Sequence, residues 1–254
     1  MTVYSTKHQL REIVDYLNAY MRIPYFQDDT VSGKIMEKII SLVHGGEQLA
    51  TYDYVDVCIR GKVGWQVKAT KKDTPLTWKR AKIANSDILI AESRKGEVGL
   101  RKLGNAIIDF CNSHARKSFN LYNLDEIGYS RLIIFADNTA VYFERLICTK
   151  KEPDIFIGDD YEWHWSAQKN THEKEQLPAL HGVNKKNKKK DFAWHGMGEN
   201  QLHFSGEKDW WPEIKMPTKF GEMFFSDDGH AIAFKLPSDK VSWESLREFL
   251  NRSN

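Results

Sequence analysis

Two segments near the start of the chain carry apolar residues at helical spacing. Residues 6–21 are expected to form an amphipathic helix that ends near Pro24. Residues 33–44 are expected to form a second helix, with Ser32 as its N-cap and Gly45 and Gly46 ending it. The apolar positions that define the two stripes are Leu10, Ile13, Val14 and Leu17, and then Ile35, Ile39, Leu42 and Val43.

The pattern changes to strand-like runs after the second helix. The sequence YVDVCIRGKVGWQVKAT, from Tyr54 to Thr70, has two short β-branched runs that meet at Gly61, which predicts a hairpin. A longer helix is expected at residues 98–116, and SRLIIFA and TAVYFERLI predict a second hairpin across Asp137 and Asn138. Residues 78–92 fit either a helix or a helix that runs into a short strand at ILIA. This order of elements predicts an α/β fold, a mixed central sheet flanked by helices, over residues 1–150.

The character of the chain changes after Lys150. Residues 151–254 are rich in tryptophan, histidine and polar residues, with short strand-like pieces such as DFAW and QLHF. The tryptophans are expected to pack in a core, and the lysine run from Lys185 to Lys190 to form a loop between strands. A strand at HAIAFKL and a helix begun by Ser242 close the chain. We therefore expect a β-rich C-terminal elaboration, either as a second domain or continuous with the first.

Composition and charge exclude several classes of protein. The 254 residues carry a net charge of +2, so the overall charge does not indicate a partner. Cys58, Cys111 and Cys148 lie in apolar surroundings without the spacing of a zinc site, so we expect buried, reduced thiols. The chain has neither a signal-peptide pattern nor an apolar run of membrane-spanning length, which predicts a cytoplasmic protein without membrane contact. It also lacks a phosphate-binding glycine loop, so no nucleotide cofactor is expected.

The hairpin from Tyr54 to Thr70 places polar residues among apolar ones. Gln66 and Lys68 project from the same side of their strand, and Asp56 joins them if the turn sets it opposite Gln66. A different turn parity would favour Asp53 instead. A carboxylate, an amide oxygen and the Val67 carbonyl are ligands for a hard divalent cation, and a lysine beside them can orient water or stabilise an oxyanion. This set predicts a Mg²⁺ site, where Mn²⁺ or Ca²⁺ is expected to substitute in binding.

At these residues the chain resembles the PD-(D/E)XK nuclease superfamily. That superfamily carries an Asp and then a Glu/Asp-x-Lys motif on a β-hairpin, after a helix that often supplies a glutamate. Asp56 and Gln66-Val67-Lys68 match the motif, and Glu37 matches the helix carboxylate. The chain departs from the pattern because Gln66 replaces the usual carboxylate and no proline precedes Asp56. The resemblance implies metal-dependent hydrolysis of DNA on a restriction-endonuclease-like core; the alternative is an ordinary hairpin with solvent-facing Gln66 and Lys68.

Basic and amide-bearing residues suggest where DNA would bind. Residues just after the hairpin can contact phosphates, and so can the later lysine run, although a solvated surface explains either cluster equally well. Side chains near residue 200 have the groups that read base edges, although structural polar residues are common in such segments. The expected DNA contacts are Lys71, Lys72, Lys79, Arg80, Lys185, Lys186, Lys188, Lys189, His195, Asn200, Gln201 and His203.

These observations predict a Mg²⁺-dependent, sequence-specific double-stranded DNA endonuclease of the type II restriction class. A homodimer is expected if the target is a palindrome, because each subunit would then cut one strand. A structure-specific repair or recombination nuclease and a non-catalytic DNA-binding module are the alternatives.

Overall fold

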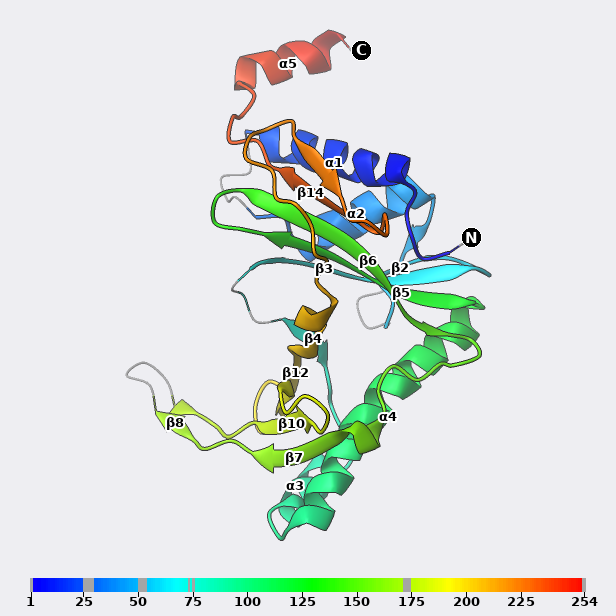
Figure 1. The fold of residues 1–254 in the computed structure, drawn as a ribbon, viewed down its shortest axis with the longest axis vertical. Helices are drawn as coiled ribbons and strands as arrows, with labels where there is room; N and C mark the ends of the chain where they lie inside the picture. Colours follow the sequence, from blue (N-terminus) through cyan, green and yellow to red (C-terminus); the bar gives the residue numbers. More distant parts are fainter. Residues whose placement is uncertain are drawn as a thin grey trace. The chain divides into compact units, whose positions relative to one another are not determined.

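The computed structural model describes residues 2–24, 30–49, 54–72, 74, 76–170 and 175–252, and its fold is mixed α/β (Figure 1). Contacts divide the chain into two units. The first unit contains Met1–Thr74, Ser118–Lys150 and Pro212–Asn254, and the second contains Pro75–Lys117 and Lys151–Trp211. The expected boundary at residue 150 is one of these limits. The expected ranges of 1–150 and 151–254 are otherwise wrong, because residues 75–117 pack with the later strands and residues 212–254 return to the first sheet.

The first unit is built on a seven-stranded mixed sheet. Its order is β1-β2-β3-β5-β6-β14-β13, and β3 runs parallel to β5 while the other neighbours are antiparallel. Asn138, with φ of 63°, closes the β5–β6 hairpin at the expected position. The strands are β1 Glu47–Gln48, β2 Val57–Ile59, β3 Val63–Lys71, β5 Glu126–Ile134, β6 Thr139–Thr149, β13 Met223–Phe225 and β14 Ala231–Lys235.

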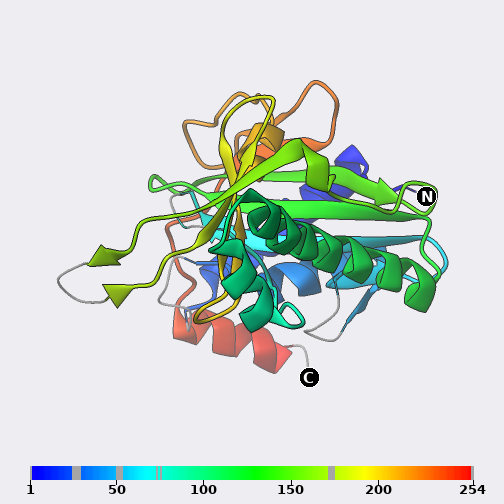
Figure 2. The ribbon, with the colours of Figure 1, turned by 90° about the horizontal axis from the view of Figure 1, so that it is seen from below.

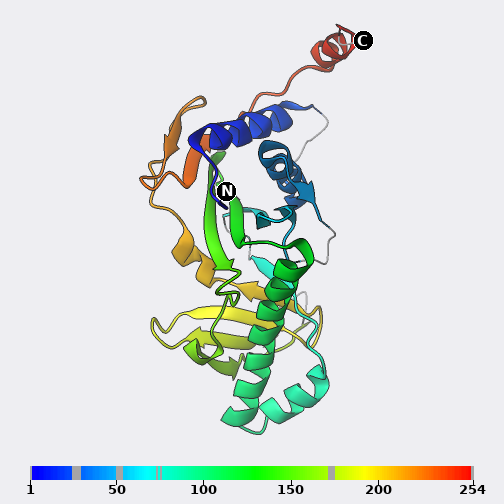
Figure 3. The same cartoon turned by 90° about the vertical axis from the view of Figure 1, so that its right-hand side faces the viewer.

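Helices α1 (Lys7–Arg22) and α2 (Gly33–His44) form one core with this sheet (Figure 3). Thr6 and Gln9 form a capping box at the start of α1, and Ser32 caps α2 as expected. Gly45 ends α2 in the left-handed region, at φ of 64°. The inward stripe of α2 differs from the expected one, because Leu42 is 49% exposed. The buried apolar positions of α2 are Met36, Ile39 and Ile40.

The second unit is built on a five-stranded antiparallel sheet of order β4-β12-β11-β10-β7. One face packs on aromatic residues, with Phe156, Phe192 and Phe204 in mutual ring contact. Gly104 of α4 lies against Trp163, where a Cβ would come within 2.3 Å of the indole. The strands are β4 Thr77–Arg80, β7 Tyr161–Trp165, β10 Leu180–Asn184, β11 Lys190–His195 and β12 Gln201–Phe204.

The remaining elements of the second unit surround this sheet. They are α3 (Ser86–Ser93), α4 (Glu97–Tyr122, which continues into the first unit), η1 (Gly158–Asp160) and η2 (Gly206–Trp210). A short ribbon of β8 (Lys169–Asn170) and β9 (Glu175–Gln176) extends beyond the sheet (Figure 2). The sequence ILIA lies inside helix α3, so a strand there is wrong, and Thr77–Arg80 form a strand where a helix was expected.

Two expectations about the rest of the chain, the C-terminal helix and the buried thiols, are confirmed. The C-terminal helix α5 (Trp243–Arg252) begins after Ser242, whose hydroxyl accepts a hydrogen bond from the Ser245 amide at 3.1 Å. All three cysteines are buried thiols outside any disulfide. Within the described ranges, none of the helices combines the length and apolarity needed to span a bilayer.

Candidate active site

The turn between β2 and β3 sets the register of the polar residues. Val57 pairs with Trp65 and Ile59 with Val63, and Gly61 between them has φ of 71°. The ladder ends at Val57: the Asp56 amide donates to the Trp65 carbonyl at 2.8 Å, so Asp56 does not form the regular pair with Gln66 that the sequence led us to expect. Its side chain still reaches β3, because the Asp56 Oδ2 atom accepts a hydrogen bond of 2.8 Å from the Val67 amide.

Alternation along β3 separates the site from the helical core. Trp65 and Val67 belong to the apolar core shared with α1 and α2. Gln66 and Lys68 therefore project from the opposite face of the sheet. Gln66 is only 2% exposed and Lys68 is half-buried, so both differ from the solvent-facing polar residues of an ordinary hairpin.

The Val67 backbone faces the same end of β2 as the Asp56 carboxylate. The N–H and C=O groups of one strand residue point toward the same neighbouring strand. Since the Val67 amide donates to Asp56, the Val67 carbonyl also points toward the β2 side, just beyond the start of that strand at Val57. A backbone oxygen thus lies beside the carboxylate and the amide side chain.

Glu37 reaches this site from α2 and is 6% exposed. The Lys34 ammonium donates to its Oε2 atom at 2.6 Å. Burial raises the pKa of Glu37, the hydrogen bond from Lys34 opposes the rise, and the charge of Asp56 adds to it. Glu37 and Asp56 are therefore close enough to repel each other, as two carboxylates that share a cation site would.

Lys68 is the cationic group of the same cluster. Burial lowers its pKa, the negative charges of Asp56 and Glu37 oppose this shift, and the charge of Arg131 adds to it. The three residues expected to act together, Asp56, Glu37 and Lys68, thus interact electrostatically.

Arg131 is a member of the cluster that the sequence reasoning missed. It is the β5 partner of Lys68 in the parallel ladder and is 1% exposed. Its Nη2 atom donates to the Thr70 hydroxyl at 3.0 Å, and its Nη1 atom to the Tyr129 hydroxyl at 3.4 Å. The sequence carried the same signal here as at Gln66 and Lys68, namely a polar or charged residue inside an apolar strand-like run.

The donor set fits a hard divalent cation. The available ligands are the carboxylates of Asp56 and Glu37, the Gln66 amide oxygen and the Val67 carbonyl, all of them oxygen atoms. The described part of the chain contains no cluster of three or more His, Cys, Asp or Glu side chains suited to a metal ion. A metal site here would therefore need amide and backbone oxygens as ligands in addition to the two carboxylates. Asp53, the alternative ligand, lies outside the described residues.

The basic residues after the hairpin separate into different environments. Lys71 and Lys72 are exposed at the end of β3, and the Lys72 ammonium lies 5.4 Å from the centre of the Phe135 ring. In the second unit, Arg80 is exposed. Lys79 is half-buried and lies close enough to Cys111 to oppose the burial that raises the pKa of that thiol to about 12. Lys79 is therefore directed toward α4, and its prediction as a phosphate contact is the weakest of the four.

The lysine run forms the β10–β11 turn, as expected. Its cations meet acidic neighbours within the second unit: Lys186 lies 3.7 Å from Asp160, and Lys188 lies 3.7 Å from Glu162. The other two contacts are Lys189 with Asp209 at 2.8 Å and Lys185 with the Asp159 carbonyl at 2.7 Å. Exposed pairs of this kind contribute only about 0–1 kcal/mol, so a phosphate can compete for these lysines.

The candidate base-contacting residues lie together on β11 and β12. His195 pairs with Gln201 across the ladder, and the His195 and His203 rings are 5.2 Å apart. Asn200 has φ of 54° in the turn, and its carbonyl accepts from the Ala81 amide at 2.7 Å. All four side chains are half-exposed.

Searches of protein-family models, curated proteins and solved structures found no match to this chain.

Proposed function

We propose that this protein is a Mg²⁺-dependent DNA endonuclease that hydrolyses phosphodiester bonds at the Asp56, Gln66 and Lys68 site. The observation that carries the proposal is that Asp56 accepts a hydrogen bond from the Val67 amide beside the buried Gln66, while the charges of Asp56, Glu37 and Lys68 lie close enough to interact. Two neighbouring carboxylates, a buried amide and a half-buried lysine gathered at one site are costly for stability, which favours a functional explanation.

The order of elements around the site supports the resemblance to PD-(D/E)XK nucleases. Helix α2, which carries Glu37, precedes the antiparallel strands β1, β2 and β3, and the next strand of the sheet, β5, is parallel to β3. The motif residues thus occupy the hairpin and the helix that the resemblance implies.

Each residue of the site has a proposed chemical role. Asp56, Gln66 and Val67 would hold the cation, and Glu37 would assist from α2. A bound Mg²⁺ ion lowers the pKa of its water and neutralises charge that develops on the phosphate. Lys68 would orient the attacking water or donate a hydrogen bond to the oxyanion. The lysines and Arg80 would contact phosphates without reading sequence.

Sequence-specific cleavage of double-stranded DNA, as in type II restriction enzymes, is the proposed form of this activity, and it rests on the resemblance alone. A homodimer would cut both strands of a palindrome. A structure-specific nuclease is the second candidate, because the five-stranded sheet of the second unit is wider than the major groove of B-DNA. A non-catalytic DNA-binding module would leave the burial of Glu37 and Gln66 without a role.

Digestion of supercoiled plasmid and of unmethylated phage DNA tests the proposal. We expect cutting with Mg²⁺, none with EDTA, and loss of cutting in Asp56→Asn and Lys68→Ala. Lys62→Ala is the matched control, because Lys62 is exposed in the turn of the same hairpin. Sequencing of the ends separates a fixed site from cutting at branches or damage. Cutting by Lys68→Ala at the wild-type rate would reject the site assignment.

A further inference from the structure

The second unit presents a row of histidines across one face of its sheet. Cross-strand partners follow one another from β7 to β4: His164 pairs with His181, His181 with Ala193, Ala193 with His203, and His203 with Thr77. Partners in a ladder project from the same face. We call these residues, together with His195, Gln201 and Arg80 of the adjoining row, the histidine face.

The histidine face is the side of the sheet turned away from the aromatic core. His181, His195 and His203 are half-exposed and His164 is exposed, while their strand neighbours Phe192 and Phe204 are buried. The His164 and His181 rings lie 5.4 Å apart, and both histidine pairs meet edge to face. The imidazoles therefore form an array of rings that a ligand can reach.

The width of this face determines which form of DNA fits it. Five strands spaced about 4.8 Å apart span roughly 19 Å, whereas the major groove of B-DNA is about 12 Å wide. Histidines in the middle of the face, such as His181, therefore cannot reach base edges inside a duplex groove. The β11–β12 turn with Asn200 is a narrower element and could enter one. The row itself can meet only bases that are unpaired.

The side chains of the histidine face suit such bases. Proteins that bind single strands stack bases on aromatic rings, including histidine, and hold the backbone with cations. Gln201, Thr77 and Arg80 add hydrogen-bonding groups between the rings. Burial lowers the pKa of His195 and the neighbouring His203 lowers it further, while Glu199 opposes the shift and Lys190 adds to it, so both charged residues lie close to this ring.

The charges of the face complement a polyanion. Arg80, Lys188 and Lys190 are its cations, against the carboxylates of Glu162 and Glu199, and Glu162 is paired with Lys188. The net charge of these groups is therefore positive even when every imidazole is neutral. Protonation of an imidazole makes it more positive.

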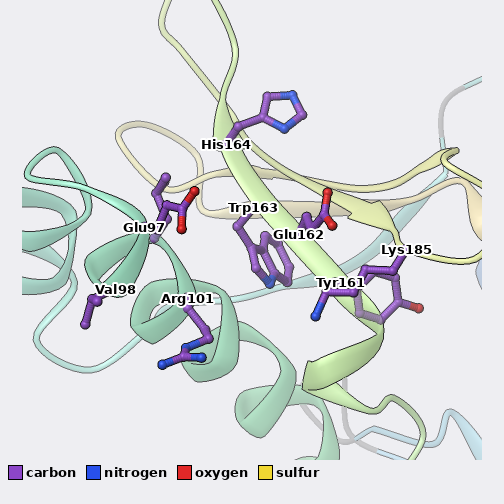
Figure 4. Close-up of a pocket in the computed structure, with 9 residues that line it drawn as sticks. Glu97, Val98, Arg101, Tyr161, Glu162, Trp163, His164 and Lys185 are labelled. Atoms are coloured by element: carbon purple, nitrogen blue, oxygen red, sulfur yellow. The ribbon is translucent and has the colours of Figure 1, made fainter.

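A hollow lies at the edge strand β7 of the same sheet, on the side where α4 packs. It encloses about 470 Å³ between the start of α4 and β7. Figure 4 shows Arg101 on the helix side and Tyr161 on the strand side of this hollow. Glu97 and Lys185 also line it, so this hollow belongs to the α4 side of the sheet and not to the histidine face.

We propose that the histidine face binds single-stranded DNA, with bases stacked on the rings of His164, His181 and His203. This inference rests on the proposed function, because it names the form of DNA that the same protein engages. The substrate would then contain an unpaired strand as well as the cleaved bond, as DNA with a branch, gap or flap does.

Fluorescence anisotropy with labelled oligothymidylate, in EDTA so that nothing is cut, tests the inference. The double variant His181→Ala/His203→Ala should lose about 5- to 150-fold in affinity for each stacked base. His8→Ala is the matched control, since His8 is an exposed histidine of α1, and its affinity should equal that of wild type. Thermal melting establishes that each variant is folded.

A conservative variant separates stacking from a loss of fold. His181→Phe/His203→Phe keeps the rings and should retain most of the single-strand affinity while alanine does not. Tighter binding of wild type to a duplex of the same sequence than to the single strand would overturn the inference, and so would alanine variants with unchanged affinity. Plasmid cutting by wild type alongside such a result would leave the proposed nuclease standing. Lys68→Ala should bind the single strand as wild type does, even though it does not cut.

Discussion

Gln66→Glu would place a second carboxylate beside Asp56, whose side chain accepts a hydrogen bond from the next residue of β3, Val67. Residues that neighbour each other across two antiparallel strands have Cβ atoms about 5 Å apart. Two unit charges at that distance repel by about 3 kcal/mol at an effective dielectric constant near 20. Because Gln66 is 2% exposed, burial of the new charge adds to this cost. A loss of about 3 kcal/mol lowers the melting temperature of a chain of this size by roughly 6–12 °C.

The same substitution should strengthen binding of a divalent cation. The glutamate restores the carboxylate that the PD-(D/E)XK pattern carries at this position, and a cation between it and Asp56 turns repulsion into attraction. Thermal melting in EDTA measures the loss of stability without a cation, and melting in Ca²⁺ measures the stabilisation by a bound cation. Neither measurement involves DNA cleavage. We expect Gln66→Glu to melt below wild type in EDTA and to gain more from Ca²⁺ than wild type gains.

Gln48→Glu provides the comparison, because Gln48 is an exposed glutamine on β1 of the same sheet. It should melt close to wild type in both conditions. If Ca²⁺ raised the melting temperatures of wild type and Gln66→Glu equally, the reasoning that places a cation beside Gln66 would be refuted.

Three further substitutions test the fold around the proposed sites. Burial raises the pKa of Glu37, so the folded state holds its proton more tightly and loses stability as the pH rises through that range. Glu37→Gln should therefore melt above wild type at neutral pH, and the difference should shrink in acid. Glu144→Ala removes three buried hydrogen bonds of 2.6–2.7 Å, one of them from Tyr142, and should cost roughly 3–5 kcal/mol in urea unfolding. Gly104→Ala brings a methyl group against Trp163 and should cost about 1–3 kcal/mol in the unfolding of the second unit.

Local signals were sufficient for much of the first unit. The caps at Thr6 and Ser32, the turn at Gly61 and the hairpin at Asn138 depend on residues close in sequence, and each element formed where its pattern indicated. That turn also set the register of β2 and β3 as far as Val57, where the ladder ends. The sequence could therefore place Asp56 near Gln66 and Lys68, but it predicted neither the bond of the Asp56 amide to Trp65 nor the presence of Arg131.

Long-range pairing explains what the sequence did not predict. Thr77–Arg80 form a strand only because β12, more than a hundred residues later, pairs with it. The sequence ILIA has β-propensity, yet it lies in α3, where Ile88 is 62% exposed. Propensity in such short segments is weak against tertiary contacts. The same non-local pairing moved residues 75–117 into the second unit, away from the range expected for them.

The position of Glu37 depends on a buried network on the far side of the sheet from Gln66. The Glu144 carboxylate accepts from the amide and hydroxyl of Ser5, and that hydroxyl lies 3.1 Å from His44 at the end of α2. His44 also packs on Trp65, the neighbour of Gln66 in β3. Glu37 lies about two turns earlier on the same helix, and a helix of that length behaves as a rigid body. A loss of the network should therefore shift Glu37 relative to Asp56, so Glu144→Gln should weaken cation-dependent stabilisation as well as lower the melting temperature.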